Sequence, residues 1–105
     1  MHVQERRRST RVAVSLPVIF QTADGSVQSG TIENLSESGM LLVANADIPP
    51  NSEVRILFGE EDASHAIEIR GRVMRSSPIG EFGLSFIGLS ARAVDAIHDA
   101  MTREA

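Results

Sequence analysis

Apolar and polar positions alternate with a period of two along most of this chain of 105 residues. In the first such stretch, residues 12–21, valine, leucine and phenylalanine stand at even positions and alternate with residues that are mostly smaller or polar. Successive side chains of a strand point to opposite faces, so one face of this segment is expected to be buried. Pro17 lacks an N–H group, and we expect it at an edge or a bulge of the sheet.

Five further segments show the features of short strands. The dipeptide Asp24-Gly25 favours a tight hairpin after the first strand. In the second strand the apolar parity changes between Val27 and Ile32, which predicts a bulge at Gly30. Pro49-Pro50 marks a loop, and the acidic and polar segment 59–63 is expected to be a hairpin connection. The five segments are approximately residues 27–33, 40–43, 54–58, 67–73 and 82–87.

Only the C-terminal segment has a helical period. Val94, Ile97 and Met101 recur at helical spacing, and Ser90 is the expected N-cap of a helix that ends at about Glu104. Six short strands followed by one helix predict an all-β fold, a small six-stranded antiparallel β-barrel with a C-terminal α-helix. A chain of this length forms one domain with a single core.

Composition narrows the class of protein. A hydrophobic content of 42% is typical of a globular chain, and the absence of cysteine excludes disulfides and thiolate metal sites. Arginines followed by an apolar run resemble a signal peptide. That run is short, is interrupted by Ser15 and Pro17, and is followed by no small-residue cleavage site, so we expect a cytoplasmic protein without membrane insertion.

Positive charge is concentrated at the N-terminus. Residues 1–11 hold four arginines and one glutamate, a charge of +3, whereas the rest holds six arginines and thirteen acids, a charge of −7. A nucleic-acid-binding protein usually has a wider basic face and stacking aromatic residues, but this chain has no Trp or Tyr. The pattern favours a small anionic ligand, and the alternative is a solvated basic tail.

Two short stretches contain the candidate binding residues. In the first, Arg7 and Arg11 each carry a planar, permanently charged fork that suits phosphate oxygens and the O6 and N7 atoms of guanine. In the second, residues 34–39 read Asn-Leu-Ser-Glu-Ser-Gly and supply short polar side chains beside a glycine. We expect the two stretches to act on one ligand. The alternative for the second stretch is an ordinary polar turn.

Catalytic and metal-binding patterns are missing from the sequence. The three histidines show no ligand spacing, the serines lack the context of a nucleophile, and no phosphate-binding glycine loop is found. The acidic run 60–62 is interpreted as a solvated hairpin tip. We therefore expect neither an enzyme nor a metal site. The histidines are His2, His65 and His98, and the last is interpreted as a residue on the flank of the helix.

The two stretches together resemble the PilZ family, bacterial receptors for the second messenger cyclic di-GMP. The family pattern R-x-x-x-R is matched by residues 7–11, and the pattern [D/N]-x-S-x-x-G is matched by residues 34–39. The resemblance also covers 16–18 and the segment from 71–73 to 83–86. It implies a six-stranded barrel with a C-terminal helix. The chain would then comprise a flexible basic arm, 1–11, and a PilZ-like barrel, 12–105, whose helix spans about 90–104.

The resemblance also implies a role for each matched residue. Arg7 and Arg11 would hold the phosphates and the Hoogsteen edges of the guanines. Asn34 and Ser36 would form hydrogen bonds with a guanine. Gly39 would give room for close approach or supply a backbone angle that a Cβ forbids. Because Asp is common where this chain has Asn34, the detailed role of that amide stays open.

Arg6 bears on the number of ligands. An arginine directly before the motif resembles the PilZ subgroup that binds two mutually intercalated cyclic di-GMP molecules, whereas an apolar residue goes with one. Two ligands carry four phosphate charges and need more cationic forks, and Arg8 is a further candidate for such a contact. The alternative is that Arg6 only adds charge to the arm.

The predicted function is binding without turnover and without a cofactor. Cyclic di-GMP would order the arm on the barrel and present a changed surface to an unidentified downstream protein. Two alternatives remain: a PilZ-like protein-interaction module that ignores nucleotide, and a small barrel that binds single-stranded nucleic acid. The acidic body of the chain argues against the second alternative.

Overall fold

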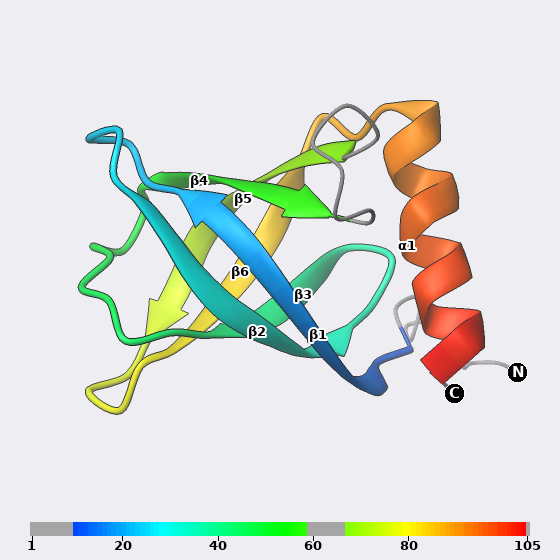
Figure 1. The fold of residues 1–105 in the computed structure, drawn as a ribbon, viewed down its shortest axis with the longest axis horizontal. Helices are drawn as coiled ribbons and strands as arrows, with labels where there is room; N and C mark the ends of the chain where they lie inside the picture. The colour runs from blue at the N-terminus through cyan, green and yellow to red at the C-terminus, as the bar shows by residue number, and fades with distance from the viewer. Residues whose placement is uncertain (1–9, 59–66, 105) are drawn as a thin grey trace, which may run out of the picture.

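The computed structural model describes residues 10–58 and 67–104, which form six β-strands and one α-helix (Figure 1). All six predicted strands and the predicted helix are present, so the expected fold class is confirmed. The elements are β1 Val12–Gln21, β2 Val27–Leu35, β3 Gly39–Val43, β4 Glu53–Phe58, β5 Ile67–Ser76, β6 Glu81–Ile87 and α1 Ala91–Glu104.

The strands close into an antiparallel barrel in the order β1-β2-β3-β6-β5-β4. Their inward faces supply the core, because the period of two brings every second side chain to the inside. Helix α1 lies across the end of the barrel at which β1 begins (Figure 1) and packs against β1 and β5. It adds three buried residues to the core, Ala93, Ile97 and Ala100.

Two local predictions are confirmed at the ends of elements. The hydroxyl of Ser90 accepts a hydrogen bond of 3.1 Å from the backbone N–H of Ala93, which is the expected N-cap geometry. In the β1–β2 hairpin, the N–H of Gly25 donates to the carbonyl of Thr22 at 2.9 Å. Gly25 has a φ of 91°, a conformation that glycine adopts without steric cost.

Pro17 lies directly after an irregularity of β1, because the β1–β2 register shifts between Ala13 and Leu16. Toward β2, Pro17 lies opposite Thr31. Toward β4, the pairing among residues 10–58 covers Ile19 to Gln21 and does not reach Pro17. The missing N–H of the proline therefore interrupts none of the β1–β4 pairs in this part of the chain.

The predicted bulge in β2 was wrong in its position. Gly30 pairs regularly with Val18, whereas the β2–β3 register shifts between Ile32 and Asn34, so the extra residue is Glu33. Gly30 serves close packing instead, because a Cβ there would stand 2.9 Å from the carbonyl oxygen of Val43. A change of parity in the sequence shows that a bulge exists, but the neighbouring strand decides where it forms.

Candidate functional site

The bulge in β2 turns Asn34 to the outer surface of the barrel. Ile32 and Leu35 are both fully buried although they are three positions apart, which regular alternation does not allow. Glu33 is the extra residue of the bulge, so two consecutive residues, Glu33 and Asn34, lie outside the core between Ile32 and Leu35. Asn34 lies opposite the exposed Ala13 of β1, close to the point where the N-terminal segment joins the barrel.

Arg11 joins the first sequence motif to the second. Its Nη1 atom donates a hydrogen bond of 2.7 Å to Oδ1 of Asn34, a residue 23 positions later in the chain. The acceptor is a neutral amide, so the positive charge of the guanidinium is not neutralised by this contact. The structure therefore brings together these two predicted site residues on the barrel surface.

Ser36 lies in the loop after β2, and its side chain is fully buried. Its hydroxyl accepts hydrogen bonds of 3.2 Å from the backbone N–H groups of Ser38 and Gly39, and it lies 3.2 Å from the carbonyl of Gly39, to which it donates. The backbone N–H of Ser36 also donates to that carbonyl at 2.9 Å. In this structure the hydroxyl shapes the loop, a task that the sequence pattern did not indicate.

Gly39 is required by close packing between β3 and β6. A Cβ at this position would collide with the carbonyl oxygen of Leu84. The φ of Gly39 is not in the left-handed region, so the structure excludes a special backbone angle and shows a reason that was not predicted, the close approach of β6. Room for the ligand stays a prediction. The N–H of Phe86 donates to the carbonyl of Ser38 at 2.9 Å and fixes the loop against β6.

The remaining predicted site residues, Arg6, Arg7 and Arg8, lie outside the described residues. The part of the site that the structure does describe consists of Arg11 and the loop between β2 and β3.

A contact between the loop and α1 was missed by the sequence analysis. His98 of α1 lies with its Nε2 atom 3.0 Å from Oε2 of Glu37, and both side chains are about half exposed. The two residues are 61 positions apart, and no local pattern of the sequence connects them. The loop that carries Ser36 is therefore held against the helix as well as against β6.

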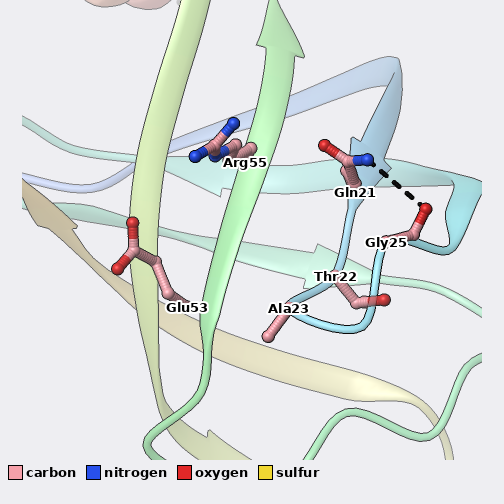
Figure 2. Close-up of a pocket in the computed structure, with 6 residues that line it drawn as sticks. All are labelled: Gln21, Thr22, Ala23, Gly25, Glu53 and Arg55. Carbon is pink, nitrogen blue, oxygen red and sulfur yellow. Dashed lines mark hydrogen bonds between the residues drawn. The ribbon is translucent and has the colours of Figure 1, made fainter.

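A hollow lies at the end of the barrel opposite to the motif residues, and no sequence motif marks the residues that line it. It is lined by the β1–β2 hairpin and by Glu53 and Arg55 of β4 (Figure 2). Arg55 lies opposite Gln21 of β1. Gln21 is eight positions along β1 from Ala13, which corresponds to about 26 Å between these two residues at the rise of a strand. The Nε atom of Arg55 lies 3.6 Å from a carboxylate oxygen of Glu68, so this guanidinium already faces a negative charge.

Residues 10–58 and 67–104 contain no group of three or more metal-ligating side chains. The one helix in this part of the chain is too short and too polar to cross a bilayer.

The PilZ domain profile matches residues 5–103. No curated protein sequence matches the chain. Among solved structures, the PilZ domain of CeSA from a cellulose-synthesizing bacterium is similar with a TM-score of 0.69 at 19% identity, over 90% of this chain and 97% of that one. The PilZ domain of YcgR from Escherichia coli, solved with c-di-GMP, has a TM-score of 0.69 at 16% identity, over 95% and 92%.

Part of a longer protein is also similar to this chain. PlzA of Borreliella burgdorferi, solved in complex with c-di-GMP, has a TM-score of 0.68 at 18% identity over 96% of this chain but only 41% of its own length. At these identities the structures show a common fold, and the sequence profile covers almost the whole chain. The chain therefore belongs to the PilZ domain family.

Proposed function

We propose that this chain is a receptor domain for cyclic di-GMP. The observation that carries the proposal is the 2.7 Å hydrogen bond between Arg11 and Asn34, which joins the two motif stretches on the barrel surface. Two similar structures, the YcgR PilZ domain and PlzA, were solved with this nucleotide. In the bacterial cytoplasm the chain would bind the nucleotide without turnover.

The chemistry of Arg11 suits both parts of the ligand. A guanidinium fork donates two parallel hydrogen bonds either to phosphate oxygens or to O6 and N7 of guanine. Asn34 uses its carbonyl oxygen on Arg11, so its NH2 group remains a donor for an acceptor atom of the base. This gives Asn34 a defined role: it orients the arginine and donates to the guanine.

The loop contributes shape rather than charge. Ser36 is proposed to hold the loop in the conformation described above, in which Gly39 allows β3 to lie close to β6. Any contact between ligand and the Ser36 hydroxyl would have to replace hydrogen bonds already made inside the loop. The proposed effect of Ser36 on nucleotide binding is therefore mainly indirect.

The arm is proposed to complete the site. Arg7 and Arg8 would join Arg11 on the ligand, and the ordering of residues 1–11 would cost conformational entropy that charge-assisted hydrogen bonds offset. The ordered arm would then present a changed surface to a downstream protein. Such a change requires only that the ligand prefer the ordered form.

The direct test is a calorimetric titration with cyclic di-GMP, with cyclic di-AMP, GTP and a single-stranded oligonucleotide as controls. We expect binding of cyclic di-GMP alone. Equal binding of all nucleotides, or preference for the oligonucleotide, would support a nucleic-acid-binding barrel. No binding of any of them at millimolar concentration would support the interaction module.

The same titration counts the ligands. Because Arg6 adds a cationic fork, we propose that one chain binds an intercalated pair of cyclic di-GMP molecules. The variant Arg6→Leu should bind fewer ligands per chain while keeping measurable affinity. One ligand per wild-type chain at saturation would reject the pair and leave the receptor function intact.

A further inference from the structure

A row of outward-facing residues crosses five strands at the level of the proposed site. Ala13 lies opposite Asn34, Asn34 opposite Leu41, Leu41 opposite Gly83, and Gly83 opposite Arg75. Neighbouring strands are about 4.8 Å apart, so the backbone of Arg75 lies about 14 Å along the barrel wall from that of Asn34. An arginine on β5 therefore shares one surface with the two motifs.

The middle of this row is formed by Leu41 of β3 and Gly83 of β6. Leu41 lies between the buried residues Met40 and Leu42, and Gly83 lies between the buried residues Phe82 and Leu84, so both face outward. A glycine has no side chain, and the neighbouring leucine offers an apolar surface. Together they form a floor against which a planar base can approach the backbone.

A second bulge brings Arg75 into the row. The β5–β6 register shifts between Val73 and Arg75, so the extra residue is Met74. The register of the preceding pairs, continued without this shift, would place Met74 opposite Gly83. Both ends of the row thus depend on an inserted residue that re-aims a polar side chain, as bulges often do beside binding sites.

The side chain of Arg75 leans over β6. Its Cβ and Nε atoms lie 3.9 and 4.0 Å from the position that a Cβ of Gly83 would occupy, so the side chain lies beside the middle of the row.

Most described arginines are already engaged. Within residues 10–58 and 67–104, ion pairs with carboxylates are formed by Arg55, Arg70 and Arg103. Arg11 and Arg72 donate to neutral oxygens. Arg75 has no such partner in the described part of the chain, so its guanidinium can engage a ligand without breaking an existing bond.

We propose that Arg75 is a further ligand-binding residue, whose guanidinium plane stacks on a guanine base that rests on Leu41 and Gly83. The inference rests on the proposed function and extends its site across β3, β6 and β5. A guanidinium is planar and weakly hydrated, and it stacks on aromatic faces in a way that an ammonium group does not. In this arrangement Arg11 and Asn34 hold the edge of one guanine of the ligand. The second guanine of the same ligand then has a face available to Arg75.

The test compares three variants in calorimetric titrations with cyclic di-GMP. Arg75→Ala should weaken binding about tenfold, within the range measured for loss of one stacking contact. Arg75→Lys should lose nearly as much, because it keeps the charge and loses the plane. The matched control is Arg55→Ala, which removes one guanidinium at the far hollow (Figure 2) and should bind like wild type.

A fourth variant tests the floor by changing Gly83, whose new side chain would lie against that of Arg75. Gly83→Val should also weaken binding, because its side chain would occupy the place of the base. A Cβ there makes only ordinary contacts, so the variant should fold, which thermal unfolding would verify.

The outcomes separate the inference from the receptor function. Wild-type binding lost in Arg11→Ala but fully kept in Arg75→Ala and Gly83→Val would overturn the inference and leave the function standing. Full rescue by Arg75→Lys would overturn stacking and indicate a phosphate contact instead. A wild-type chain that does not bind cyclic di-GMP would overturn both.

Discussion

The two ends of β1 treat positive charge differently. At the hairpin end, Arg55 faces the carboxylate of Glu68. At the motif end, Arg11 is held by the neutral amide of Asn34. An anion that approaches the first arginine must compete with a carboxylate, whereas an anion that approaches the second meets an oriented cation whose hydrogen-bond partner is neutral. The partner of an arginine, more than its presence, therefore marks an anion site.

The two ends also use glycine for different reasons. Gly25 has a positive φ and nothing within 4 Å of the position a Cβ would take, so only its backbone angle matters. Gly39 has an ordinary angle, but the carbonyl oxygen of Leu84 occupies the space of its Cβ. The hairpin end needs glycine for its positive φ, whereas the motif end needs glycine because a Cβ would not fit against β6.

The largest expected effect is on the motif glycine. Gly39→Val forces β3 and β6 apart and should lower the free energy of unfolding by about 3 kcal/mol, as for severe overpacking. Gly25→Ala should cost only about 1 kcal/mol, the strain of a left-handed alanine. Urea denaturation measures both. Equal losses would show that the two glycines do not differ in the way the structure indicates.

Arg11→Ala removes the cation at the motif end of β1. Loss of a charge-assisted fork should weaken cyclic di-GMP binding by about 2 kcal/mol, roughly 30-fold, while the free energy of unfolding changes little because the side chain is exposed. Arg55→Ala, with the same loss of charge, should leave the affinity unchanged. Normal binding by Arg11→Ala in calorimetry would contradict its assigned role.

The buried hydroxyl of the loop gives a smaller effect. Ser36→Ala leaves two backbone N–H groups without their acceptor and should lower the free energy of unfolding by about 1.5 kcal/mol, with a loss of roughly 1 kcal/mol in nucleotide binding. Ser29→Ala, an exposed serine on β2, is the control. A change in binding with unchanged stability would indicate direct contact with the ligand and argue against a loop-shaping role.

The smallest effect belongs to the hairpin. Hydrogen bonds from the Thr22 hydroxyl and then from the Ser26 backbone lower the pKa of Asp24. A carboxylate with a lowered pKa stabilises the fold above its unfolded-state pKa, and this contribution is lost as the pH falls through the folded-state value. Asp24→Asn should therefore reduce the loss of stability below about pH 4. An unchanged acid slope in urea unfolding, or the same change in Arg11→Ala, would contradict this assignment.

Local patterns predicted the elements of the fold because each pattern is contained within one segment. The alternation of β1 and the cap at Ser90 depend only on residues a few positions apart, and both are confirmed. The bulge at Glu33 depends on how β2 meets β3, and the sequence could show only that the parity changed.

The site was less predictable because its contacts join segments that are far apart in the sequence. The pattern identified Arg11 and Asn34 as candidates, but their hydrogen bond spans 23 positions and appears only when the barrel closes. The burial of Ser36 and the contact of Glu37 with His98 likewise depend on elements that are distant in sequence. The roles assigned to Arg6, Arg7 and Arg8 remain predictions.

The bulge at Glu33 makes this part of β2 sensitive to chain length. Removal of Glu33 would make the β2–β3 ladder regular and keep Ile32 and Leu35 in the core, but two residues of β1, Val14 and Ser15, would then lie opposite no residue of β2. The exposed side chain of Glu33 can be exchanged, because only its backbone is needed to fill the register. Deletions should therefore be far more damaging here than substitutions, and an alignment of related chains should keep the number of residues between these two apolar positions fixed while Glu33 itself varies.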